Sequence, residues 1–330
     1  MDDLAPRLRA VCDLGVAEMR EYSGRHEYDG KIQDLSREGV RHGLGRLAAA
    51  RASGQRLDDS HDEAQLATFE EHARVSLGDL ELHRRSPALH LAAMDLACYD
   101  RDYAPRQQRG DAALAQLAAW PQAVDAAIDA LDQVSAPVAT ALAEGIRGLA
   151  AGIPAYASEP ARAAALSAHA RLVAHVDTAA SSGDPDAALG TAALTALMSS
   201  AEGIRVDLGR LGERADAERD RLSALLAESC ARLNPGKPPL EVARELVCDH
   251  PDADGVIDAA RYWTARAIDF TRERDLVPYQ DGECLVGLAP ESRRWAMAMM
   301  TPAAPGGEEV PPAPEVKGTN GLLLPTPSGN

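Results

Sequence analysis

The segment VIDAARYWTARAIDFTRERDLVPYQDGECLVGL, residues 256–288, indicates the fold class most clearly. Its apolar residues recur at spacings of four, three, four and three, which places them on one face of a helix. They are Val256, Ala260, Trp263, Ala267 and Phe270. A polar turn follows, and then a short apolar run. We therefore expect a packed helical unit here, with at most a short strand near residues 284–288.

Similar apolar periodicity continues along almost the whole chain and predicts a series of helices. Ala and Leu, which have high helix propensity, supply much of the apolar content, and aromatic residues are only 4% of the chain. The sequence therefore predicts an all-α, elongated multi-helix domain. The expected helices include residues 4–22, 60–80, 87–99, a helix ending at Trp120, another beginning at Pro121, and 135–149, 159–180, 185–200, 206–233, 239–248 and 291–300.

The last 29 residues have a different composition from the rest of the chain. Residues 302–330 contain seven Pro, five Gly and no aromatic residue. Such a segment has little apolar surface to bury, so we expect a disordered tail. The tail contains one apolar cluster, Leu322-Leu-Leu324. The simplest interpretation is that it belongs to a frayed chain end, and the alternative is that it docks on the body of the protein or on a partner. The predicted division is a helical domain at 1–301 and a Pro/Gly-rich tail at 302–330.

Charge and cysteine usage exclude several classes of protein. The formal net charge of −17 argues against nucleic acid or an anionic membrane as the main partner, because both require clustered Lys and Arg. The pairs Arg84-Arg85 and Arg293-Arg294 are too short for such a patch, and we interpret them as solvated helix ends. Five widely spaced cysteines without a Cys-x-x-Cys motif predict reduced thiols. Together with the absence of a signal-peptide pattern, they lead us to expect a cytoplasmic protein.

Metal-binding chemistry has no clear motif in this sequence. A zinc peptidase helix carries His-Glu-x-x-His, in which two His four residues apart face one metal ion. The sequence has no such motif, and His26-Glu27 is followed by no second His at that spacing. Cys248 and His250 lie close in sequence to Asp249 and Asp252. Cys284 could approach them only if the tertiary structure brings it there. We interpret that region as ordinary helix-end polarity, and we assign no metal-binding, cofactor-binding or catalytic residue.

Two other stretches carry groups that exchange protons. The loop at residues 25–35 is rich in charged and aromatic side chains, and loops of this kind can line a site, although most simply cover a surface. Paired acids and phenols occur together at residues 99–103 as Tyr99, Asp100, Asp102 and Tyr103. A helix end held by ion pairs is the simpler interpretation of that cluster. Glu283 lies next to an apolar run, where partial burial would raise the pKa of its carboxyl group.

Several stretches together resemble the amino-terminal half of the bacterial family called domain of unknown function 885, in particular its actinobacterial members. Each stretch alone is a weak signal, and their order along one chain carries the resemblance, which covers about residues 20–301. The stretches are Gly24-Arg-His-Glu-Tyr-Asp-Gly-Lys-Ile-Gln-Asp-Leu-Ser36, Leu82-His-Arg-Arg-Ser-Pro-Ala-Leu-His90, Asp95-Leu-Ala-Cys-Tyr-Asp-Arg-Asp-Tyr-Ala-Pro105, Leu117-Ala-Ala-Trp-Pro121 and Leu285-Val-Gly-Leu-Ala-Pro-Glu-Ser-Arg-Arg-Trp295.

The resemblance implies a mostly helical protein related to zinc metallopeptidases, with the metal helix in the carboxy-terminal half. That half lies beyond the matched region, so no zinc ligand or catalytic residue carries over. We therefore expect the helical, substrate-enclosing part of a metallopeptidase-like hydrolase. On this view the chain is a truncated, frame-shifted or split product, inactive alone, with zinc in full-length relatives. Its expected partners are the missing catalytic half and, once restored, a peptide-like substrate. The alternative is a non-catalytic helical interaction or scaffold protein.

These two expectations differ in the surface that they predict. If the chain packs against a missing half, apolar side chains should be exposed where that half would lie. We place that patch around Trp263, Phe270, Leu285, Leu288 and Trp295. A self-contained interaction protein would instead hold these side chains in a closed core.

Overall fold

The structure is a computed structural model that describes residues 4–277, 284–296, 299–301 and 321–324, and the chain is all-α, as the sequence predicts. Short 3-10 or π-helical segments (η) connect many of the α-helices. In chain order the elements are α1 (Pro6–Cys12), α2 (Val16–Tyr22), η1 (His26–Tyr28), α3 (Arg37–Ala52), α4 (Ser60–Ala73), η2 (Arg74–Asp79), α5 (Leu82–Arg85), α6 (Pro87–Met94), η3 (Ala97–Asp100), α7 (Arg106–Ala130), α8 (Ala136–Gly148), η4 (Leu149–Gly152), α9 (Glu159–Ser182), α10 (Thr191–Glu202), α11 (Leu208–Leu233), α12 (Pro239–Val247), α13 (Val256–Glu273), β1 (Gly287–Leu288), η5 (Glu291–Arg293), β2 (Met299–Thr301) and β3 (Gly321–Leu324).

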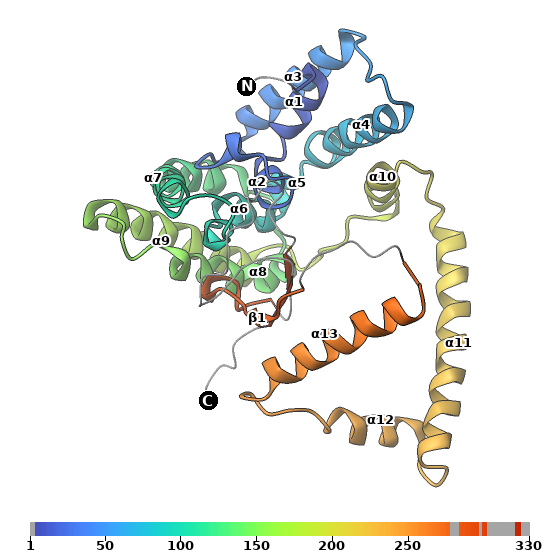
Figure 1. The fold of residues 1–330 in the computed structure, drawn as a ribbon. Helices are drawn as coiled ribbons and strands as arrows, with labels where there is room; N and C mark the ends of the chain where they lie inside the picture. The colour runs from blue at the N-terminus through green and yellow to red at the C-terminus, as the bar shows by residue number, and fades with distance from the viewer. Residues whose placement is uncertain (1–3, 278–283, 297–298, 302–320, 325–330) are drawn as a thin grey trace.

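The main core forms where α9 packs along both α7 and α8 (Figure 1). Trp120, Val124, Ile146 and Leu172 are fully buried in it. Pro121 lies inside α7, whereas the sequence predicted two helices that meet there. Proline removes one backbone hydrogen bond from a helix. Burial of Trp120 and Val124 on either side of it offsets that cost, so the helix continues.

The amino-terminal helices form a second, smaller layer, held by an unusual buried ion pair. Arg7 on α1 donates from Nε to Glu70 Oε1 at 2.7 Å and from Nη2 to Glu70 Oε2 at 2.8 Å. Its Nη1 also donates to Glu63 at 2.7 Å, so one guanidinium joins α1 to two turns of α4. A bidentate ion pair of this kind is required to offset the free-energy cost of burying a carboxylate as deeply as Glu70.

Helices α11, α12 and α13 extend away from the packed body (Figure 1). α13 has no buried residue, α11 buries only Cys230, and α12 buries only Val242. The prediction of an apolar face on α13 is correct in its spacing, but the expectation that the unit packs is wrong. Trp263 is 66% exposed and Phe270 is 51% exposed. Periodicity shows which residues share a face and cannot show whether a partner covers that face.

A small sheet has the order β1-β3-β2, with β1 parallel and β2 antiparallel to β3. The strand expected near residues 284–288 is β1. The short helix expected at 291–300 is wrong, because among the described residues of that range only η5 is helical, and β2 follows it. Residues 302–320 and 325–330 of the predicted tail lie outside the described residues. Within that tail, Gly321–Leu324 is strand β3, so the prediction of disorder does not hold for these four residues.

Two other predicted helix boundaries differ from the structure. The helix expected at 4–22 is divided into α1 and α2, because the chain leaves helical geometry at Gly15 (φ −135°, ψ 46°). The helix expected to begin at Pro185 begins instead at Thr191, after Gly190 at φ +80°. A positive φ of this size is accessible to glycine at low cost, and here it redirects the chain into α10.

Candidate functional site

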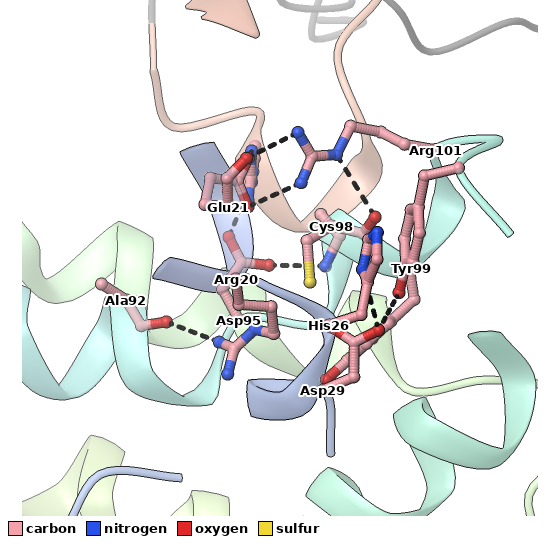
Figure 2. A network of polar contacts seen from close by, with 12 residues as sticks. Arg20, Glu21, His26, Asp29, Ala92, Asp95, Cys98, Tyr99 and Arg101 are labelled. Atoms are coloured by element: carbon pink, nitrogen blue, oxygen red, sulfur yellow. Dashed lines mark hydrogen bonds and ion pairs between the residues drawn. The ribbon is translucent and has the colours of Figure 1, made fainter. Parts of the chain in front are cut away.

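The two proton-exchanging stretches of the sequence meet in one polar cluster (Figure 2). Tyr103 donates its hydroxyl hydrogen to Asp29 Oδ2 at 2.8 Å. Tyr99 accepts the backbone N–H of Gly30 at 2.7 Å and donates to Gln116 Oε1 at 2.7 Å. Gly30 has a φ of +75°, a turn geometry that directs its N–H to the phenol. The loop at 25–35 therefore lies against the segment at 97–103 through specific contacts.

His26 completes this cluster on its more exposed side. Its ring is stacked on Tyr103, with centroids 4.5 Å apart and planes 4° from parallel. His26 Nδ1 is 3.4 Å from Asp29 Oδ2. Neither His26 Nδ1 nor Asp29 Oδ1 has a hydrogen-bond partner among the described residues, although both atoms are buried. Buried polar atoms without partners are rare in native structures and often indicate a functional or water-binding role.

The surroundings shift the pKa values in this cluster in a consistent direction. Burial raises the pKa of Asp29, and the hydrogen bond from Tyr103 opposes this rise only in part. Burial and the adjacent Asp29 carboxylate together raise the pKa of Tyr103. A carboxyl group with a raised pKa beside a phenol and an imidazole is able to donate or accept a proton. Asp100 and Asp102, the other acids of the predicted set, are exposed and lie outside this contact.

A buried ion-pair network adjoins the cluster and joins the two ends of the described chain. Arg293 on η5 donates from Nη1 and Nη2 to the two carboxylate oxygens of Glu21 at 3.0 Å each. Its Nε donates to Asp95 Oδ2 at 2.6 Å. Arg101 contributes a second cation, with Nη1 donating to the backbone carbonyl of Glu21 at 2.7 Å. Two of the stretches that carry the resemblance, residues 95–105 and 285–295, therefore meet at this network.

Although burial opposes ionisation, the hydrogen bond from Arg293 and the charges of Arg293, Arg101 and Arg20 lower the pKa of Glu21. Arg20 donates to the backbone carbonyls of Lys31 at 2.9 Å and Ala92 at 3.4 Å. Burial raises the pKa of the nearby Cys98 thiol to about 12. A buried thiol with a raised pKa stays protonated at neutral pH, which fits a packing role for Cys98.

The structure separates most of the other candidates. Cys248 and Cys284 are exposed, and His250 Nδ1 lies 2.8 Å from the carbonyl of Pro251. Glu283 lies outside the described residues. Within the described ranges no group of three or more His, Cys, Asp and Glu side chains is placed to hold a metal ion. His90, His169 and His175 each use Nε2 to contact a backbone carbonyl at 2.8 Å, which gives these rings a structural role.

Sequence reasoning missed the ion-pair network almost entirely. The interpretation of the basic pairs as solvated helix ends is wrong for Arg293. Arg293 is 7% exposed, whereas the adjacent Arg294 is exposed and pairs with Glu291 on the surface. The acids that hold Arg293 lie 272 and 198 residues away in the chain. No local pattern signals partners at that distance.

No protein-family model and no curated protein matches this chain. Among solved structures, it is similar to a protein from Shewanella oneidensis described as "a putative lipoprotein of unknown function", with a TM-score of 0.60 and 16% sequence identity. The match covers 97% of this chain and 63% of that one, so this chain spans less than two thirds of the other protein's length. At this identity the likeness establishes a shared fold class, an all-α multi-helix architecture. None of the helices that the structure describes is long and apolar enough to cross a membrane.

Proposed function

We propose that this chain is the helical, substrate-enclosing part of a zinc-dependent metallopeptidase-like hydrolase, and that the metal helix comes from outside this chain. The observation that carries this proposal is the exposure of the apolar faces of α11, α12 and α13. Large exposed apolar patches mark sites where another protein segment packs.

The residues of the expected patch support the proposal. Trp263, Phe270, Leu288 and Trp295 are 66%, 51%, 53% and 43% exposed, and Leu285 is partly buried. Other large apolar side chains are exposed on the same three helices. They are Leu211, Leu222, Leu225, Leu226 and Leu233 on α11, Leu240, Leu246 and Val247 on α12, and Tyr262 on α13. A closed core, which the alternative predicts, would bury these side chains.

The fold comparison also fits this proposal. Almost all of this chain, the exposed helices included, aligns with a longer protein of the same architecture. The order of the five resembling stretches implies a relation to zinc metallopeptidases. A peptide-like substrate and a carboxy-terminal catalytic partner are part of the proposal on that ground.

Zinc itself does not fit the described residues of this chain. Structural and catalytic zinc sites need three or four converging His, Cys, Asp or Glu ligands. No such group occurs in the described ranges, and the polar cluster at Asp29 supplies one imidazole and one carboxylate. We therefore derive no catalytic step through a metal on these residues.

Reading the DNA beyond codon 330 in all three frames tests this proposal. We expect a segment that encodes His-Glu-x-x-His or a closely similar helix with a downstream Glu. If no frame contains such a segment and no separate gene supplies it, the hydrolase proposal is wrong. The alternative, a non-catalytic helical interaction or scaffold protein, would then be the remaining candidate.

A further inference from the structure

A pocket of about 460 Å³ lies between α3 and the segment that follows α4. This volume is within the range of sites that hold small ligands. Its apolar wall consists of Val40, Leu44 and Leu77. Its polar wall consists of Arg37, Glu38, Arg41, Glu81 and His83. The pocket is separate from the cluster at Asp29 and from the exposed faces of α11–α13.

The backbone around this pocket departs from regular helix in two places. The segment η2 is a π-helix, whereas the sequence predicted one continuous α-helix through Leu80. π-Helical turns are uncommon and occur frequently at functional sites. Glu81 then adopts a left-handed conformation with φ +47°, which is costly for a residue other than glycine. Leu77, Gly78 and Glu81, which line the pocket, all come from this irregular stretch.

His83 supplies a second, independent sign of a ligand. Its side chain lines the pocket and is only 3% exposed, and its Nδ1 has no hydrogen-bond partner among the described residues. Burial lowers the pKa of His83, so its ring is neutral at neutral pH and one of its nitrogens carries a hydrogen. The His83 carbonyl contacts His90 Nε2 at 2.8 Å, which fixes this segment of backbone. A buried imidazole at a pocket wall, on a fixed backbone and with one ring nitrogen that has no hydrogen-bond partner among the described residues, is suited to hydrogen-bond a ligand.

The pocket lining carries two cations, Arg37 and Arg41, and two carboxylates, Glu38 and Glu81, so the ligand group that fits depends on which of them can change its partner. Arg84 pairs with Glu81 at 2.6 Å and with Asp132 at 2.8 Å, so the carboxylate of Glu81 already has a cation. Arg37 also pairs with Asp132, at 2.6 Å. Arg41 has a side chain that is 78% exposed and is 3.4 Å from Glu38, which is a long and solvent-screened contact. Arg41 is therefore the rim cation best placed to exchange its partner for a ligand.

We propose that this pocket binds a small carboxylate with an apolar chain. The guanidinium of Arg41 pairs with the carboxylate, as Arg does in bidentate recognition of such groups. The apolar chain lies against Val40, Leu44 and Leu77. His83 donates or accepts one further hydrogen bond and limits how deep the ligand sits.

Titration of the full chain with hexanoate at pH 7, followed by calorimetry and by the imidazole NMR signals of His83, tests this proposal. We expect saturable binding that shifts the His83 signals. Arg41→Ala should weaken binding about tenfold, which corresponds to about 1.4 kcal/mol. Arg171→Ala is the matched control, because Arg171 is an exposed, ion-paired arginine on α9 outside this pocket, and it should leave binding unchanged.

Two further probes, hexylammonium and 1-hexanol, separate the charge from the apolar chain. The proposal predicts that hexanoate binds more tightly than either. Equal or tighter binding of hexylammonium would overturn the assignment of an anion, and equal binding of 1-hexanol would show that Arg41 contributes nothing. Absence of saturable hexanoate binding to the wild-type chain would overturn the site itself. Because Arg41 is exposed on α3, its substitution leaves folding intact and the comparison stays interpretable.

Discussion

Replacing Arg293 with Met should destabilise the protein strongly, although the pair Arg293-Arg294 looks like a solvated helix end in the sequence. The side chains of Arg293, Glu21 and Asp95 are 9%, 11% and 16% exposed, so the substitution leaves two nearly buried carboxylates without their cation. Removal of one partner from a buried ion pair costs about 3–5 kcal/mol. Arg101 also lies near Glu21, at 3.9 Å, and compensates a part of this loss, so we expect about 3 kcal/mol.

The adjacent arginine provides the matched control for this prediction. Arg294 is 45% exposed at its side chain and pairs with Glu291 at 2.5 Å, and Arg294→Met should cost less than about 1 kcal/mol. Urea denaturation followed by circular dichroism at pH 7 measures both variants. The slope with denaturant should stay constant, so that the midpoint reports the stability. Equal midpoints for the two variants would refute the reasoning that the Arg293 network holds the carboxy-terminal segment on the body.

Three other predictions follow from the same structure. The pKa of Glu21 is lower in the folded state than its unfolded value of about 4.3, so ionised Glu21 stabilises the fold above that pH. The difference in free energy of unfolding between wild type and Glu21→Gln should therefore be at its full size at pH 7 and should shrink as the pH falls below about 4. Trp120→Ala, at a fully buried site, should cost about 3–5 kcal/mol in urea denaturation, whereas Trp263→Ala should cost less than about 1 kcal/mol, and equal costs would contradict the exposure of α13. In carboxyl NMR titration the pKa of Asp29 should lie above the usual value of about 3.9, and Tyr103→Phe should raise it further, because the lost hydrogen bond favours the charged form; a fall would contradict the contact.

Local patterns in the sequence predict the fold class well. Apolar spacing and Ala/Leu content identify most of the helices, and the helix starts predicted at residues 87 and 135 are correct within a residue. The errors occur where tertiary contacts override a local signal. Pro121 does not end α7, because fully buried neighbours hold the helix on both sides. The π-helical turn at Arg74–Asp79 likewise has no signature in apolar spacing.

The candidate sites are predictable only in part, for a related reason. The residue types at 25–35 and 99–103 indicated proton-exchanging chemistry, and the fold brings Asp29 and Tyr103 together. Their contact joins positions 74 residues apart, which a single sequence does not reveal. Arg293 and Arg294 are adjacent residues of the same type, but Arg293 is buried in an ion-pair network and Arg294 is exposed. The sequence alone does not distinguish them. The exposed face of α13 is the opposite case, because its pattern is that of a core helix and only the structure shows that nothing among the described residues covers it.

The most direct test of the proposed function is zinc-dependent peptide hydrolysis by this chain and by the product restored with its downstream catalytic segment. The account predicts no hydrolysis by this chain alone, and hydrolysis by the restored product that a chelator abolishes and added zinc recovers. Trp263→Asp in the restored product should reduce that activity, because it places a charge on the exposed face of α13, where the proposed catalytic segment would pack. Hydrolysis by this chain alone, or a restored product that stays inactive with zinc, would contradict the account.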